Sequence, residues 1–150
     1  MRLTTKGQYA VRAMVKLASH RDGEPVSLKD ISREEGISLA YLEQLFLKLR
    51  KGDIVRSVRG PGGGYVLARA AVDISVGDVI AVVEEPLNPV ACLDDDVEAC
   101  TRADNCITQN IWKGLGDRIK GFLNSISVED LLSELEEARG GAHMCDVQSK

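Results

Sequence analysis

The clearest amphipathic pattern in the chain covers residues 38–51, and the neighbouring segments are arranged around it. One helical face carries the apolar residues Leu39, Leu42, Leu45, Phe46 and Leu49. The opposite face carries Ala40, Glu43, Gln44, Leu47, Lys48 and Lys51. Ser38 stands at the N-cap position, and Gly52 with Asp53 ends the pattern. The pattern predicts a helix with one buried face and one face open to a partner.

A strand–turn–strand pattern follows this helix. Residues 53–58 and 65–67 are predicted strands, and the glycine-rich run 60–64 joins them in a turn too tight for side chains at its tip. A shorter helix over residues 27–35 comes before, and Gly36 supplies the left-handed residue of the turn between the two helices. Helix, glycine turn, helix and hairpin is the order of a winged helix-turn-helix, which docks on DNA.

Four further segments, residues 4–21, 75–85, 106–127 and 127–140, also show helical spacing of apolar residues. Ser27 to Asp30 resembles a capping box with Asp in place of Glu. Ser75 caps the next predicted helix with Asp78 in its first turn, and the run from Ser127 to Asp130 caps the last one. The fold class is therefore mostly α with a small β wing.

The longest pattern, residues 106–127, carries a continuous apolar stripe. Its members are Ile107, Ile111, Leu115, Ile119, Phe122 and Ile126, widened by Trp112 and Leu123. Such a helix is roughly 30 Å long, and a chain this short has little with which to cover it. We therefore expect a two-fold homodimer through this helix, with burial inside one subunit as the alternative. Glycines cost about 1 kcal/mol each inside a helix, so close helix approach would explain Gly114, Gly116 and Gly121.

The sequence predicts four parts. Residues 1–85 form the winged helix-turn-helix domain, residues 86–105 a cysteine-bearing loop, residues 106–140 the dimerisation helix and a C-terminal helix, and residues 141–150 a flexible tail. No apolar run approaches the roughly 20 residues of a membrane span, and the N-terminus lacks a signal-peptide core. We expect a cytoplasmic protein with reduced thiols and no membrane partner.

Charge is divided unevenly along the chain. Residues 1–70 hold 13 Lys/Arg and 7 Asp/Glu, whereas the remaining 80 residues hold 6 and 16, which together give the net charge of −4. The acidic total would argue against nucleic acid, but phosphate attraction is local, because exposed charges beyond about 10 Å are screened. The basic half coincides with the predicted DNA-binding domain.

Three of the four cysteines, Cys92, Cys100 and Cys106, lie in the irregular acidic loop. Three soft ligands within fifteen residues can converge on one metal centre with little loop-closure cost, and thiolates suit an iron–sulfur cluster or zinc. Zinc sites usually show tight cysteine pairs, which are absent from this loop. Gln109 is a poor fourth ligand for iron. His143, Cys145 or a group from a partner subunit are the alternatives.

An enzyme is disfavoured. The glycine-rich loop joins two strands and is not followed by Gly-Lys-Ser/Thr, so it does not match a phosphate-binding loop. Only His20 and His143 are available to pair with a nucleophile, and no such pairing is suggested. We expect no small-molecule substrate.

The run from Met1 to Met14, the run from Gly36 to Tyr65 and the three cysteines before a long helix resemble IscR-type regulators, which are bacterial winged-helix iron–sulfur repressors. The resemblance extends to about Leu135. It implies a homodimer that crosses its long helices, a cluster held by Cys92, Cys100 and Cys106, and binding to an operator in double-stranded DNA set by cluster status. A [2Fe–2S] cluster is favoured. The spacing of the first two cysteines also resembles relatives with a [4Fe–4S] cluster, and Gln109 stands where a histidine is expected.

The same resemblance implies a set of DNA-binding residues. Glu43, Gln44 and Arg59 would contact bases, with Ala40 at a base-reading position, and Tyr41, Ser57, Gly60 and Gly64 would follow the backbone. Gln44 can pair with adenine, Arg59 can enter a groove from the wing, and Glu43 can accept from cytosine N4. For Glu43 the alternative is a solvated charge beside Lys48.

The predicted function is a DNA-binding transcriptional regulator, a repressor, controlled by an iron–sulfur cluster and governing genes of cluster assembly or iron homeostasis. The alternative is a metal-free thiol/disulfide sensor or a nitric-oxide sensor of the same fold. Nitric-oxide-sensing relatives use an acidic residue near the N-terminus, where this chain has Gln8.

Overall fold

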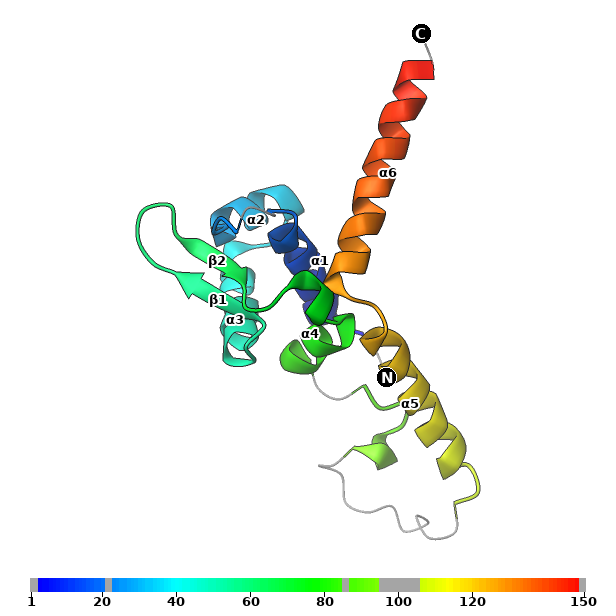
Figure 1. Ribbon diagram of the computed structural model, residues 1–150. Helices are drawn as coiled ribbons and strands as arrows, with labels where there is room; N and C mark the ends of the chain where they lie inside the picture. The colour runs from blue at the N-terminus through cyan, green and yellow to red at the C-terminus, as the bar shows by residue number, and fades with distance from the viewer. Residues whose placement is uncertain (1–2, 21–22, 85–86, 95–105, 149–150) are drawn as a thin grey trace.

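The computed structural model describes residues 3–20, 23–84, 87–94 and 106–148, with residues 141–148 described by their helical backbone alone. Helices dominate, and two strands form one antiparallel hairpin, which confirms the predicted fold class (Figure 1). The elements in chain order are α1 (Thr5–Ala18), α2 (Leu28–Glu35), α3 (Leu39–Lys51), β1 (Val55–Val58), β2 (Gly64–Leu67), the 3-10 turn η1 (Ala71–Asp73), α4 (Val76–Val83), the 3-10 turn η2 (Ala91–Leu93), α5 (Gln109–Asn124) and α6 (Val128–Gln148). None of the helices in the described residues is long and apolar enough to cross a bilayer.

The core lies between α1, α3, α4 and the start of α6. Its largest fully buried side chains include Met14 of α1 and Phe46 of α3, and the predicted apolar face of α3 packs into it. Val128 and Leu132 of α6 are fully buried in the same cluster. The core of the winged domain is therefore completed by residues that follow the cysteine loop in the sequence.

The helix-turn-helix forms through local capping. The Ser27 and Ser38 side chains accept hydrogen bonds from the backbone N–H groups of Asp30 and Tyr41, and Gly36 adopts the left-handed conformation (φ 66°) between the two helices. One detail differs from the sequence prediction: the Asp30 carboxylate binds Arg33, so this capping box is half formed. As predicted, Gly52 and Asp53 end α3, and Asp53 is the residue that adopts the left-handed conformation (φ 56°).

The wing is anchored to α3 and to the loop before α2. Strands β1 and β2 pair in the register Ser57 to Tyr65, and Tyr65 also exchanges backbone hydrogen bonds of 2.9 and 3.0 Å with Val26. The Tyr65 ring meets the Phe46 ring edge to face, with 4.8 Å between centroids. The wing is thus held at a fixed angle to α3.

Helices α5 and α6 extend from this body in different directions (Figure 1). Both α4 and α6 start at complete Ser–Asp capping boxes, and their first residues lie side by side through the Ser75–Ser127 bridge. The long helix is shorter than the predicted span 106–127, whereas α6 continues past Gly140 to Gln148, where the sequence predicted a tail.

Candidate nucleic-acid interface and metal centre

The outer face of α3 presents the predicted base-reading residues to solvent. Ala40, Glu43 and Gln44 are exposed, whereas the neighbouring Leu42 and Leu45 are buried. A helix with this division can place side chains in the major groove while its other face stays in the core. The structure therefore brings these three residues together on one accessible surface.

Tyr41, predicted to follow the DNA backbone, is half-buried at the beginning of α3 and is supported by α1. Its ring packs edge to face on Tyr9, with 5.8 Å between centroids. Its hydroxyl lies 3.5 Å from the Thr5 hydroxyl. Tyr41 is consequently held in place by the first turns of α1.

Glu43 and Lys48 do not form the solvated pair considered as the alternative role for Glu43. The Lys48 ammonium donates instead to the Val83 carbonyl at the end of α4 (3.4 Å). Among the described residues, no ion pair is observed for Glu43. Its carboxylate projects from the reading surface without a neutralising partner there.

The wing tip places the remaining predicted DNA-binding residues at an exposed edge. Ser57, Arg59 and Gly60 are exposed, and Gly60 adopts a positive φ of 104°. Gly64 is half-buried, and a Cβ there would lie 2.3 Å from the Val26 carbonyl oxygen. Gly64 is therefore required for the close pairing of the wing with the body, whether or not it also meets DNA.

Ion pairs fix α2 against α1 beside α3, which is called the reading helix below. Arg12 binds Glu35 (3.0 Å) and Lys16 binds Glu34. The hydrogen bond and charge of Lys16 lower the pKa of the exposed Glu34 carboxyl. A lowered pKa means that this contact contributes stability above the carboxyl's ordinary pKa and loses it as the pH falls.

Cys92 lies in the exposed turn η2 and is a free thiol. The Asn88 side chain closes this turn by donating to the Leu93 carbonyl (3.0 Å) and to the Asp94 carboxylate (2.8 Å). Pro89 rests on α5, where a Cβ at Gly116 would lie 3.1 Å from its ring. The segment that carries Cys92 is thus seated on the middle of the long helix.

Cys106 is half-exposed and stands three positions before α5. Its sulfur lies 3.4 Å from the Thr108 hydroxyl, and its carbonyl accepts from the Gln109 N–H (3.3 Å). Cys100 lies outside the described residues, as do the side chains of His143 and Cys145. No cluster of three metal-binding side chains occurs within the described part of the chain. Thiolates at both ends of the loop are nevertheless the donor type that suits iron–sulfur clusters.

The apolar stripe of α5 is largely uncovered. The exposed side chains of the stripe, with their exposed fractions, are Ile107 (91%) in the turn before α5, and Ile111 (61%), Trp112 (37%), Leu115 (42%) and Phe122 (64%) in the helix. Gly114 and Gly121 have open space where a Cβ would project, whereas Gly116 is covered by Pro89. The alternative expectation, burial of this apolar stripe within one subunit, is therefore not met by the described residues.

A model of the Rrf2 family, described as iron-dependent transcriptional regulators, matches residues 3–134. The chain belongs to the Rrf2 family. It is 52% identical to the HTH-type transcriptional regulator IscR of Photorhabdus laumondii over 136 residues, which cover 91% of this chain and 82% of the relative.

Solved structures of Rrf2 relatives share the fold. IscR of T. potens matches with a TM-score of 0.73 and 42% identity, covering 92% of this chain and 90% of that one. CymR, described as the global cysteine regulator of B. subtilis, matches with a TM-score of 0.73 and 38% identity, covering 89% and 98%. The Rrf2 chain is accordingly a DNA-binding transcriptional regulator and not an enzyme.

Contacts that the sequence did not predict also shape these surfaces of the Rrf2 chain. Asn88 holds the turn around Cys92, and Lys48 and Glu84 join α4 to α3 and α1. Their partners in α1 and α4 lie 80 and 35 positions away in the chain, so periodicity and capping rules do not reveal them.

Proposed function

We propose that this Rrf2 protein is a repressor whose binding to a double-stranded DNA operator is controlled by an iron–sulfur cluster held by Cys92, Cys100 and Cys106. The observation that carries the proposal is the placement of residues 87–94, which carry Cys92 and are called the cysteine segment below. Pro89 seats the Cys92 turn on α5, and Cys106 leads directly into the same helix. A cofactor bound by this segment would change the position of α5. In the dimer proposed below, α5 sets the distance between the reading surfaces of the two subunits. The relatives named IscR and the iron-dependent description of the family support the proposal.

The reading surface supplies sequence recognition. Gln44 pairs with adenine and Arg59 enters a groove from the wing, whereas Glu43 accepts from cytosine N4. Ala40 leaves room for close approach to the bases. Contacts from the remaining predicted residues, Tyr41, Ser57, Gly60 and Gly64, position the protein on the phosphate backbone.

The functional unit is a homodimer formed through α5. A continuous apolar face with large exposed side chains is unusual on a monomer and typical of an interface. A Cβ at Gly114 or Gly121 would meet none of the described residues within 4 Å, so both positions allow a second helix to approach closely. Two-fold pairing places two reading heads at a fixed spacing, which suits an operator with two half-sites.

The three cysteine thiolates would hold the cluster, which would crosslink positions of one fifteen-residue loop and supply a redox-sensitive charge. A [2Fe–2S] cluster is the favoured form and a [4Fe–4S] cluster the alternative. The fourth ligand is His143, Cys145 or a group from the partner subunit, because the Gln109 amide is a poor ligand for iron. The regulated genes belong to cluster assembly or iron homeostasis, and the protein acts in the cytoplasm.

Anaerobic native mass spectrometry tests this function, since one mass gives the cluster type and the dimer state. We expect a dimer carrying one cluster per chain, and a Cys92→Ser, Cys100→Ser, Cys106→Ser variant that is iron-free with altered operator affinity. Wild-type protein that is colourless and iron-free when purified without oxygen, yet regulates normally, would refute cluster control.

The second candidate function is a metal-free thiol sensor. Exposure of the Cys92 thiol favours it, because oxidation follows access to the sulfur. CymR, which shares the fold, is described in an oxidised form from Staphylococcus aureus. Charge-transfer absorption in anaerobically purified protein separates the two functions, since a thiol sensor has none.

A further inference from the structure

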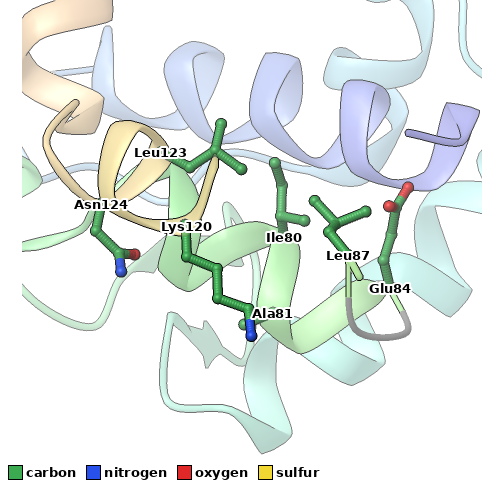
Figure 2. A pocket seen from close by; sticks show the side chains of 8 residues that line it. Ile80, Ala81, Glu84, Leu87, Lys120, Leu123 and Asn124 are labelled. Carbon is green, nitrogen blue, oxygen red and sulfur yellow. The ribbon is translucent and has the colours of Figure 1, made fainter. Parts of the chain in front are cut away.

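The last residue of α4's C-terminal turn holds the beginning of α1. One carboxylate oxygen of Glu84 accepts three hydrogen bonds, from the Thr4 N–H (3.0 Å), the Thr4 hydroxyl (2.5 Å) and the Gly7 N–H (2.8 Å). Figure 2 shows Glu84 directed toward the start of α1, away from Lys120 and Asn124. A residue 80 positions away in the chain therefore caps this helix.

The physical need for this contact is visible in α1 itself. The first turn of α1 contains no acidic residue, and its N–H groups carry the positive end of the helix dipole. The N-cap Thr4 hydroxyl accepts from the Lys6 N–H (3.2 Å) and itself donates to Glu84. The Glu84 carboxylate supplies the missing anion. Gly7 makes the approach possible, because a Cβ at this position would lie 2.7 Å from the carboxylate oxygen.

The beginning of α1 in turn supports the reading helix. The Thr5 hydroxyl lies 3.5 Å from the Tyr41 hydroxyl, and the Tyr9 ring packs against the Tyr41 ring. A shift of the first turn of α1 therefore displaces Tyr41, a residue proposed to contact the DNA backbone.

The same turn of α4 also holds the other end of α3. Val82 packs so closely on Gly52 that a Cβ there would lie 2.6 Å from a Val82 methyl group. The Val83 carbonyl accepts from Lys48 (3.4 Å). Val82 and Val83 at the end of α4 thus contact one end of the reading helix directly, and the C-cap residue Glu84 reaches its other end through α1.

On its other side this turn leads toward the cysteine segment. Glu84 precedes Cys92 by eight positions, and with Leu87 it lines a cavity that Lys120 and Leu123 of α5 complete (Figure 2). Any rearrangement of residues 87–94 on α5 acts on the chain next to Glu84. Coupling between sites travels through contiguous packed elements of this kind.

We propose that Glu84 is a positioning residue that transmits the state of the cysteine segment to the reading helix; this inference rests on the proposed cluster control. In one state the Glu84 carboxylate holds α1, and α1 holds Tyr41. In the other state the carboxylate leaves the α1 N-terminus, and Tyr41 loses its support. Because coupling is reciprocal, operator binding also stabilises the state of the segment that favours the Glu84 contact.

The test uses Glu84→Gln, which keeps the shape of the side chain and removes its charge. Operator affinity is measured by fluorescence anisotropy for cluster-loaded and cluster-free dimers, on a DNA site selected in vitro with the wild-type protein. Glu137→Gln, an exposed glutamate of α6, is the matched control. Hydrogen exchange of residues 4–9, without DNA, reports the Glu84 contact directly in both states.

For Glu84→Gln we expect the ratio of the two affinities to move toward one by about 2- to 30-fold, at unchanged iron content and dimer mass. Exchange at the start of α1 should become fast in both states. Thr5→Val, which removes the contact with Tyr41 but not the Glu84 contact, should reduce the ratio as well and keeps the proposal testable if Glu84→Gln does not fold.

If the ratio of the cluster-loaded to the cluster-free affinity is unchanged in both variants, Glu84 does not transmit the state of the cysteine segment. This includes the case in which both affinities fall equally, because a merely structural residue would have that effect. If the wild-type protein itself binds equally well in both states, cluster control fails and the proposed role of Glu84 fails with it. The two failures are therefore distinguishable.

Discussion

Glu43 is a carboxylate on a surface that must meet phosphates, and at the residue scale its presence needs a reason. It is exposed between Ala40 and Gln44, and its candidate partner Lys48 is engaged with α4. A negative charge there weakens non-specific attraction to DNA at every site. Its benefit is discrimination, because a carboxylate accepts from cytosine and repels sites that offer only acceptors.

Replacing Glu43 by Ala should relax sequence choice without abolishing binding. The repulsion that penalises incorrect sites disappears, so their affinity rises toward that of the cognate site. In vitro selection from a randomised operator measures the change, with Gln44→Ala as a comparison that should lose cognate affinity instead. Equal weakening at all sites would contradict the discriminating role.

Arg59 reaches outward from the exposed wing tip, where Gly60 turns the chain. If Arg59 contacts a base, Arg59→Ala should cost about 1–3 kcal/mol at cognate sites and relax specificity at one position. Titrations at several salt concentrations distinguish this from a phosphate contact, whose loss would weaken all sequences alike and reduce the salt slope by about one.

At the scale of the elements, what could be predicted from sequence was local. The turn at Gly36, the caps at Ser38, Ser75 and Ser127 and the buried face of α3 were all predicted correctly, because each depends on neighbours within one or two turns. The contacts of Glu84, Lys48 and Asn88 were missed, since they depend on how separate elements meet. The roles of the cysteines and of the DNA-binding residues stay predictions.

Gly116 is a glycine that the sequence identifies only as unfavourable inside a helix, and tertiary packing explains why it is there. A close helix approach was expected for the three glycines of the long helix, but at Gly116 the neighbour is Pro89 of the cysteine segment. The glycine therefore allows the segment to lie on α5.

Gly116→Ala should displace the Pro89 segment and accelerate cluster loss, because the added methyl group would lie 3.1 Å from the proline ring. The decay of visible absorbance under air measures this loss. Gly140→Ala in α6 is the matched control, since its Cβ meets nothing within 4 Å. Equal decay rates in the wild type and both variants would show that the contact does not hold the segment.

At the scale of the whole molecule, the uncovered stripe of α5 and the turn before it holds five of the nine large exposed apolar side chains of the described residues. Phe122→Asp places a charge on the proposed interface near the C-terminal end of α5, and burying an unpaired charge is costly. We expect monomers by light scattering and a loss of operator affinity, because one reading head cannot bind two half-sites. Val72→Asp, at an equally exposed valine outside α5, should remain dimeric. A dimeric Phe122→Asp protein would place the interface elsewhere.

Val128 and Leu132, from the first turns of α6, fill the core behind α1. On the ribosome, the cysteines and α5 are made before the residues that close the reading head. A truncated chain that stops at residue 85 lacks Val128 and Leu132, and the buried cluster that includes Ile74 would be incomplete. We therefore expect that residues 1–85 do not fold stably on their own. The DNA-binding domain should fold together with the cysteine segment and α5, because α6 completes its core.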